Sequence, residues 1–283
     1  MPTASHDDLL NARYGSQVKP DNIIWNAQVE QLIAHKSVRA FLPDPLPDGA
    51  LETMVAAAQS ASTSSNLNQW SVIAVSDATT RERLAYLARE QRPGQPEGAG
   101  VNEWIAQAPT VLLWVLDGSR NHETASAQGV PREVFDYLDS FLMGAVDTAL
   151  AAQNAVVAAE SIGLGVTYLG SMRNRAEEVA ELVGLPRHSI VVFGMVVGRP
   201  DPQRDTNVRP RPAQNVVLHR ERYNERPDGW LAAYERAYLE FRTASGMRPK
   251  TWADAIGGSV SYEYMDGRQN LRRTLQERGF GLQ

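Results

Sequence analysis

The sequence predicts an α+β fold, in which a single domain continues into a helical C-terminal extension. Short apolar runs at 70–75, 109–116, 165–169 and 189–197 have the length of β-strands. Longer stretches with helical spacing lie between them, and the chain is helical and charged in pattern from residue 228 onward. This alternation of strand and helix patterns, without an internal repeat, favours one mixed domain.

The four predicted strands differ in how completely they are apolar. The runs 109–116 (PTVLLWVL) and 189–197 (SIVVFGMVV) are continuously apolar, which is typical of strands covered on both faces. The runs 70–75 (WSVIAV) and 165–169 (GVTYL) are shorter.

The predicted helices are separated by segments rich in glycine and proline. Residues 91–100 (QRPGQPEGAG) form a predicted loop, and residues 199–214, rich in proline and arginine, form a second one that we expect to be ordered. The spacing of apolar residues predicts helices over 22–34, 48–61, 78–90, 140–162 and 174–184.

Composition excludes several classes of function. Basic residues number 28 and acidic residues 33, a net charge of −5 with no basic block, so we expect no nucleic-acid partner. The chain has no cysteine, and its five histidines show no metal-ligand spacing, so we expect no metal site. The N-terminus lacks a signal-peptide pattern, and the helix over 140–162 carries Asp147 and Glu160. We expect a cytoplasmic protein without a membrane partner.

A cluster of possible anion ligands follows the first predicted helix. In His35-Lys36-Ser37-Val38-Arg39 an extended chain places His35, Ser37 and Arg39 on one side. An imidazole, a hydroxyl and a guanidinium can all donate hydrogen bonds to phosphate oxygens. The alternative is a solvated helix end or strand edge.

Two further polar segments are candidates for binding. Arg209-Pro210-Arg211 projects two guanidiniums from a stiff chain, which suits an anion, although such a segment also occurs on ordinary surfaces. Residues 62–66 (STSSN) offer hydroxyls and an amide that could bind a heteroaromatic ring or a ribityl chain. They could equally form a polar connector.

The order and spacing of these segments resemble the nitroreductase family, most closely its oxygen-insensitive NADPH nitroreductase and flavin reductase branch. His35–Phe41 resembles the family's H-R-S-x-R-x-F signature. The resemblance continues through residues 62–65, 147–149, 151–155, 159–161, 163–165, 168–174, 185–186 and 209–212. It implies a nitroreductase-like α+β fold with a central, mainly antiparallel sheet flanked by helices. It also implies a homodimer with a domain-swapped C-terminal extension. The implied divisions are an N-terminal extension over 1–25, an FMN-binding core over 26–215 and a helical extension over 216–283.

The resemblance implies a set of cofactor-binding residues. The phosphate of FMN and neighbouring atoms would be held by His35, Lys36, Ser37, Arg39, Arg209 and Arg211. The ribityl chain and ring edge would be held, from the opposite subunit, by Thr63, Ser64 and Ser65. The ring near N5 would be lined by Tyr168, Leu169, Gly170 and Ser171, with a backbone N–H as the donor. Gln91 matches a ring-contacting glutamine of the branch, and Gln95 is the alternative.

Three residues depart from the branch pattern: Ser171 replaces a glycine, Lys36 an arginine and Arg209 a lysine. The second and third replacements preserve charge, whereas Ser171 alters the wall of the pocket. Residues 1–25 precede the usual start of the branch, and the sequence suggests no role for them.

The resemblance also implies the reaction. The flavin supplies the redox chemistry, so no catalytic residue of the protein is expected. The implied mechanism is ping-pong, with two electrons passing from NAD(P)H, NADPH being favoured, to nitroaromatics, quinones or free flavin. The 2′-phosphate of NADPH could meet Arg173, Arg242, Arg248 or Lys250, which could also be solvated helix charges. The alternatives are a non-catalytic FMN-binding or sensing module, and an FMN enzyme of the same fold that performs dehalogenation or flavin fragmentation.

Overall fold

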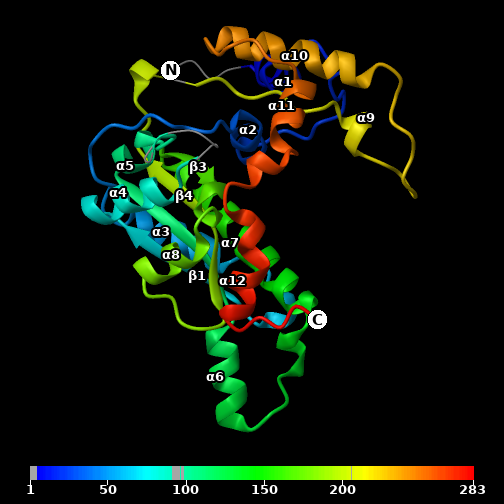
Figure 1. Ribbon diagram of the computed structural model, residues 1–283. Helices are drawn as coiled ribbons and strands as arrows, with labels where there is room; N and C mark the ends of the chain where they lie inside the picture. Colours follow the sequence, from blue (N-terminus) through cyan, green and yellow to red (C-terminus); the bar gives the residue numbers. More distant parts are fainter. Residues whose placement is uncertain (1–4, 91–95, 97–98, 205) are drawn as a thin grey trace. The chain divides into compact units, whose positions relative to one another are not determined.

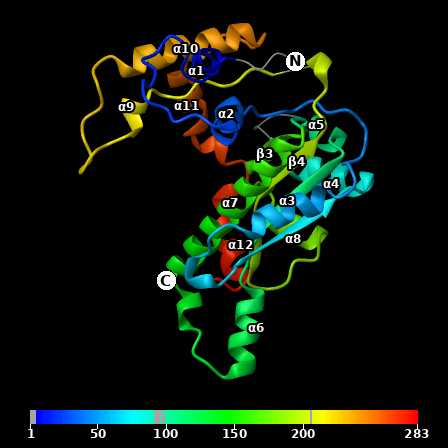
Figure 2. The same cartoon turned by 180° about the vertical axis from the view of Figure 1, so that it is seen from behind.

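The computed structural model of the protein describes residues 5–90, 96, 99–204 and 206–283. The chain divides into two compact units. One joins Met1–Ser37 to Asp205–Tyr264, and the other joins Val38–Arg204 to Met265–Gln283. We call them the helical unit and the sheet unit, and Figures 1 and 2 show the elements of each from opposite sides.

The sheet unit is built on a four-stranded antiparallel sheet of strand order β1-β2-β4-β3. The strands are β1 (Trp70–Val75), β2 (Thr110–Asp117), β3 (Gly165–Leu169) and β4 (Ser189–Gly198). Each of them lies within one residue of its predicted range. The two continuously apolar runs became β2 and β4, which pair with each other at the centre of the sheet, so the α+β prediction is confirmed.

Helices cover both faces of this sheet, as Figure 1 shows. On one face lie α3 (Ala50–Gln59) and α7 (Leu138–Ser161). On the other lie α4 (Ala78–Leu87), α5 (Glu103–Gln107) and α8 (Ala176–Leu182). Strand β2 contributes to the hydrophobic cores on both faces of the sheet. Leu113 packs on the face covered by α4, α5 and α8, whereas Leu112 and Trp114 pack on the face covered by α3 and α7. This alternation explains why every residue of β2 is buried.

Helix α7 is long and apolar enough to cross a bilayer by length and composition alone. In the fold it contacts α3 and strand β2, and it buries Asp147, Ala151, Ala155 and Ala159. A helix with these contacts is the core helix of a globular domain. Its small side chains let it approach α3 closely.

The remaining elements of the sheet unit surround this core. They are α6 (Ser119–Gln128), α12 (Leu271–Glu277) and the 3₁₀ turns η1 (Ser64–Asn66), η2 (Glu133–Asp136), η3 (Gly170–Arg173), η4 (Pro202–Arg204) and η6 (Arg268–Asn270). The end of the chain returns to this unit, where Leu275 and Phe280 pack against Leu116 and Ile190.

The helical unit contains α1 (His6–Tyr14), α2 (Ala27–Ala34), α9 (Gln214–Val217), α10 (Trp230–Ala244) and α11 (Trp252–Ser259). The turn η5 (Tyr262–Met265) follows α11. Helix α10 buries Tyr234, Tyr238 and Phe241, and the ring of Trp252 from α11 packs edge-on against Tyr234 at 5.2 Å. Aromatic packing between helices therefore forms the core of this unit.

One predicted helix begins later than expected. The range 22–34 is helical only from Ala27, because the side chain of Asn26 accepts a hydrogen bond of 2.9 Å from the N–H of Val29 and caps the helix there. The sequence also gave no helix for residues 6–14, where α1 forms behind a capping box of Ser5 and Asp8.

Candidate functional site

The two segments predicted to bind a phosphate lie side by side in the helical unit. The guanidinium of Arg13 joins them: Nη2 donates to the carbonyl of His35 at 2.8 Å, and Nη1 donates to the carbonyl of Arg209 at 2.8 Å. The same Nη2 also donates to the carbonyl of Ile33, at the end of α2. Residues separated by more than 170 positions are thus held within the reach of one guanidinium.

The backbone of residues 209–211 is irregular and satisfied by tertiary contacts. The carbonyl of Pro210 accepts from the hydroxyl of Tyr234 at 3.3 Å, and the N–H of Arg211 donates to the carbonyl of Arg13 at 2.9 Å. The side chain of Gln17, only 6% exposed, donates to the carbonyl of Arg211 at 3.0 Å. Buried backbone polar groups need such partners where no helix or sheet supplies them.

The guanidiniums of this segment remain available for an anion. Within residues 5–90, 96, 99–204 and 206–283, neither Arg209 nor Arg211 forms an ion pair or a side-chain hydrogen bond. Arg209 lies over the ring of Phe241 at 5.6 Å, and Arg211 is exposed. These two guanidiniums, the imidazole of the half-buried His35 and the hydroxyl of the half-buried Ser37 have the donor chemistry that a dianionic phosphate requires.

Arg39 belongs to the sheet unit. It follows Val38, whose N–H donates to the carbonyl of Val166 on β3 at 2.9 Å. Val38 is buried whereas Arg39 is exposed, which agrees with the alternation expected of an extended chain. The guanidinium of Arg39 lies 5.8 Å from the centre of the Trp104 ring.

The serine-rich segment forms the tight turn η1 in the sheet unit. Ser65 and Asn66 adopt left-handed φ angles of 49° and 55°, which strain non-glycine residues. The turn is anchored by Asp147 of α7, whose Oδ1 accepts from the N–H of Ser64 at 2.9 Å. Asp147 is only 1% exposed, and its Oδ2 has no hydrogen-bond partner within the described parts of the chain. A strained turn, partly open to solvent and lying beside the unsatisfied oxygen of a buried carboxylate, suits the hydroxyls of a ligand.

The predicted ring-contacting residues lie where β3 passes into η3. Leu169 is buried and ends the strand, and Gly170 begins the turn. The first N–H groups of a helical turn have no partner within it, so this is a place where a backbone donor could serve a ligand. Tyr168 is exposed, with its ring packed edge-on against Phe193 at 5.2 Å, while Ser171 is half-buried.

The arginines considered for NADPH fall in different units. Arg242 and Arg248 lie together in the helical unit, since Nε of Arg242 donates to the carbonyl of Arg248 at 2.8 Å. Arg173 lies in the sheet unit and donates to the carbonyl of Val192 at 2.5 Å. Gln91 and Gln95, the two candidates for the ring-contacting glutamine, lie outside the described residues.

Comparison with known sequences decides the family. A sequence model of the nitroreductase family matches residues 32–199, and a model of the family's C-terminal domain matches residues 209–283. The chain belongs to the nitroreductase family. The resemblance drawn from the His35–Phe41 motif is thereby confirmed.

Relatives of this nitroreductase-family chain are similar along most of their length. It is 35% identical to a protein named NADPH-flavin oxidoreductase from Vibrio harveyi, over 84% of this chain and 92% of the relative. It is 34% identical to an oxygen-insensitive NADPH nitroreductase from Salmonella typhimurium, over 81% and 88%. The solved structure of Bacillus megaterium NfrA2 superimposes with a TM-score of 0.81 at 31% identity, over 92% of this chain and 100% of that one. The nitroreductase-like fold is thus confirmed.

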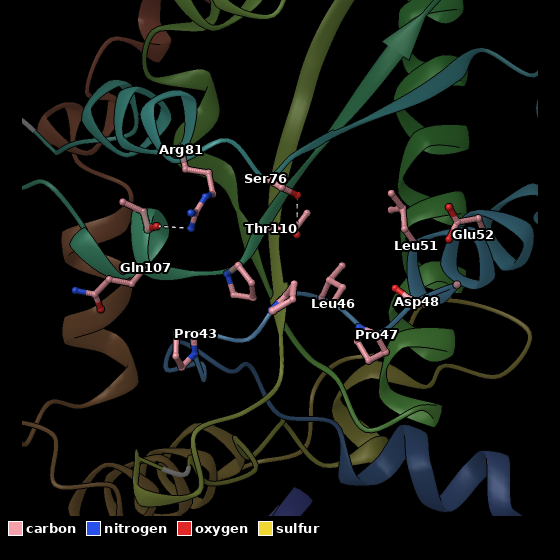
Figure 3. A pocket seen from close by; sticks show the side chains of 14 residues that line it. Pro43, Leu46, Pro47, Asp48, Leu51, Glu52, Ser76, Arg81, Gln107 and Thr110 are labelled. Carbon is pink, nitrogen blue, oxygen red and sulfur yellow. Dashed lines mark hydrogen bonds between the residues drawn. The ribbon is translucent and has the colours of Figure 1, made fainter.

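The sheet unit of this nitroreductase-family chain also contains a cavity of about 640 Å³ that sequence analysis did not predict. Figure 3 shows Arg81 and Gln107 on one side of it and Asp48 and Glu52 on the other, with prolines between them. Nη1 of Arg81 donates to the carbonyls of Ala106 and Ala108. Of the predicted flavin-binding residues that the structure describes, none lines this cavity.

A second cavity, of about 550 Å³, lies beside two stacked histidines. The rings of His122 and His188 are 3.5 Å apart and nearly parallel. Burial, reinforced by the charges of His188 and Arg132, lowers the pKa of His122 to about 4. Burial, reinforced by Arg187, also lowers the pKa of His188. Both rings are therefore neutral at pH 7.

Sequence analysis missed three residues that shape the site of this nitroreductase-family chain. Arg13 and Gln17 lie in the N-terminal segment for which the sequence suggested no role. Asp147 was noted only as a charge in the helix over 140–162 and as part of a longer motif. The capping pattern Ser5-x-x-Asp8 could have revealed the helix that carries Arg13. No local pattern identifies the carbonyl groups that Arg13 binds.

Proposed function

We propose that this protein is an FMN-containing oxidoreductase that transfers two electrons from NAD(P)H to a small acceptor. NADPH is the favoured reductant, the mechanism is ping-pong, and nitroaromatics, quinones and free flavin are the acceptors. Family membership supports this, and so do the names of its relatives, which are NADPH-flavin oxidoreductase, oxygen-insensitive NADPH nitroreductase and, in Bacillus subtilis, FMN reductase (NADPH). FMN, when bound, would supply the redox chemistry by accepting a hydride from NAD(P)H and passing two electrons on to the acceptor.

One observation carries the proposal: the guanidinium of Arg13 holds the backbones of His35 and Arg209 together. We propose that His35, Lys36, Ser37, Arg209 and Arg211 bind the FMN phosphate, together with Arg39. Several cationic donors are needed for a doubly negative group, and charge-assisted hydrogen bonds to it are about twice as strong as neutral ones.

The other predicted residues position the flavin. We propose that Thr63, Ser64 and Ser65 bind the ribityl chain and ring edge. Residues 168–171 line the ring near N5, with a backbone N–H at the start of η3 as the donor. Arg242 and Arg248, adjacent in the helical unit, are proposed to bind the 2′-phosphate of NADPH, and Arg173 is the third candidate. Gln91, or Gln95 in its place, remains a predicted ring contact.

The surface of α7 supports a homodimer. Leu138, Leu142, Val146 and Leu150 are 56%, 57%, 45% and 46% exposed and recur every four residues, so they form one apolar stripe. We propose that this stripe packs against a second copy of the chain, and that the helical extension over 216–283 packs on that partner. The FMN-binding core would span 26–215. The protein is proposed to be cytoplasmic, without a nucleic-acid or membrane partner.

The test combines spectroscopy with steady-state kinetics. The purified protein is expected to be yellow, and anaerobic addition of NADPH is expected to bleach the flavin. Turnover is then measured with NADPH and NADH against nitroaromatics, quinones, FMN and FAD. A flavin that NADPH does not bleach would indicate a binding or sensing module instead. Reduction without turnover of any acceptor in the panel would indicate other chemistry on this fold, such as dehalogenation.

A further inference from the structure

The N-terminal segment that includes α1 is an ordered part of the helical unit. Asp8 and Ser5 cap α1 reciprocally, and Leu10 is buried. At the far end of α1, Gly15 approaches α10 so closely that a Cβ there would lie 2.7 Å from the Cβ of Ala237. His6 adds a stacked contact at 3.9 Å with Trp25. The helix is thus fixed at both ends.

This segment lies outside both matches to the nitroreductase family, which cover residues 32–199 and 209–283. The alignment with NfrA2 takes in that whole chain but only 92% of this one. Helix α1, over residues 6–14, thus lies outside the residues that the two family models match.

Two side chains of the segment contact the backbone on both sides of the proposed phosphate site. Arg13 donates to the carbonyls of His35 and Arg209, each at 2.8 Å. Gln17 donates to the carbonyl of Arg211 at 3.0 Å and accepts from the N–H of Ala213 at 3.2 Å. A guanidinium suits the first role because its planar fork can serve several carbonyls at once.

These contacts oppose a cost that the proposed site creates. Arg209 and Arg211 stand two residues apart and each brings a guanidinium to the proposed site, and like charges in proximity repel one another. The backbone that carries the two arginines is irregular, so no ladder of helix or sheet bonds holds it in place. The hydrogen bonds from Arg13 and Gln17 hold the backbone of this segment in place before FMN binds. Less conformational entropy is then lost on binding.

We propose that Arg13 and Gln17 are positioning residues for the phosphate of FMN. They hold His35 and the 209–211 segment in the geometry that binds the phosphate, without contacting it themselves. This proposal rests on the proposed function. The proposal predicts that loss of either side chain weakens binding of the phosphate and not of the ring. The reason is that α1 supports the phosphate-binding segments of the helical unit, whereas the ring-lining residues 168–171 lie in the sheet unit.

The experiment compares FMN with riboflavin, which has the same ring and ribityl chain but no phosphate. Both are titrated against the full-length apoprotein by quenching of flavin fluorescence. Arg13→Ala is expected to raise the Kd for FMN by about 10- to 100-fold, and Gln17→Leu by about 5- to 10-fold, given the strength of buried hydrogen bonds. The Kd for riboflavin should change by less than about 3-fold in both variants. Arg13→Lys, which keeps the charge but not the fork, should fall between Arg13→Ala and the wild type.

Arg222→Ala is the matched control, because it removes one exposed cation from the same unit. It should leave both constants unchanged. Equal losses of FMN and riboflavin affinity in the Arg13 and Gln17 variants, or no loss of either, would overturn the proposal. Should Arg13→Ala fail to fold, Gln17→Leu and Arg13→Lys decide the question. A wild type that binds FMN no more tightly than riboflavin would instead overturn the proposed phosphate site itself.

Discussion

Residues 168–171 and residues 209–211 are both proposed to contact the flavin, yet they are fixed in different ways. Residues 168–171 lie at the end of β3 and the start of η3. Strand β3 pairs with β4 along its whole length, and Leu169 and Met172 pack into a hydrophobic core. The second group has no regular structure, and its backbone is held by Arg13, Gln17 and Tyr234. The comparison teaches that apolar packing fixes one part of the site and that a few polar side chains fix the other.

The largest effect is expected from a cavity in the core of the sheet unit. Leu113 is fully buried on β2, so Leu113→Ala should lower the free energy of unfolding by about 2–5 kcal/mol, measured by urea denaturation. Leu218→Ala, at an exposed leucine of the helical unit, is the control and should change it by less than about 0.5 kcal/mol. Similar losses for the two variants would contradict the conclusion that apolar packing stabilises the sheet unit.

The next largest effect is expected at Arg211, in the segment whose backbone is held by polar side chains. Arg211→Ala deletes an exposed guanidinium that forms no hydrogen bond or ion pair within the described residues, so the stability of the apoprotein should hardly change. The affinity for FMN should fall by about 10-fold or more, because a charge-assisted hydrogen bond is lost. Fluorescence titration measures the affinity, and thermal melting of the apoprotein measures the stability. A large drop in melting temperature with unchanged FMN affinity would contradict a binding role for Arg211.

A smaller effect is expected from pH in the sheet unit. The pKa of His122 lies at about 4 in the folded chain and near 6.5 when unfolded, so the unfolded state takes up the proton first as pH falls. Stability should be complete above pH 6.5 and decrease toward pH 4, by no more than about 1 kcal/mol because the ring is partly solvated. Urea denaturation at several pH values should show this slope, and His122→Phe should flatten it. If His122→Phe and the wild type show the same dependence of unfolding free energy on pH, groups other than His122 cause that dependence.

The smallest effect tests backbone strain in the serine-rich turn. Ser65 adopts a φ of 49°, which glycine reaches without steric cost, so Ser65→Gly should raise the stability of the apoprotein by at most about 1 kcal/mol. Ser71→Gly, on strand β1, is the comparison of opposite sign and should lower it, because glycine weakens a strand and because the hydroxyl that donates to Asp117 is lost. Thermal melting distinguishes the two signs. Destabilisation by both substitutions would show that Ser65 carries no strain.

Much of the sheet unit could be predicted from local sequence. The runs 109–116 and 189–197 became β2 and β4 because burial on both faces requires continuous apolar residues. The motif His35–Phe41 also located one side of the proposed phosphate site. The pairing of the 1–37 and 205–264 segments into one compact unit could not be predicted, since it depends on contacts between residues far apart in the chain.

The sequence by itself therefore determined the strands, most of the helices and the family, because each depends on residue types at short spacing. Only the tertiary structure decided that Arg13 and Gln17 lie beside Arg209 and Arg211, and that Asp147 anchors the turn at Ser64. The acceptors of Arg13 and of Gln17 are backbone carbonyls, which every residue carries. No residue pattern can mark one of them as a partner before the chain has folded.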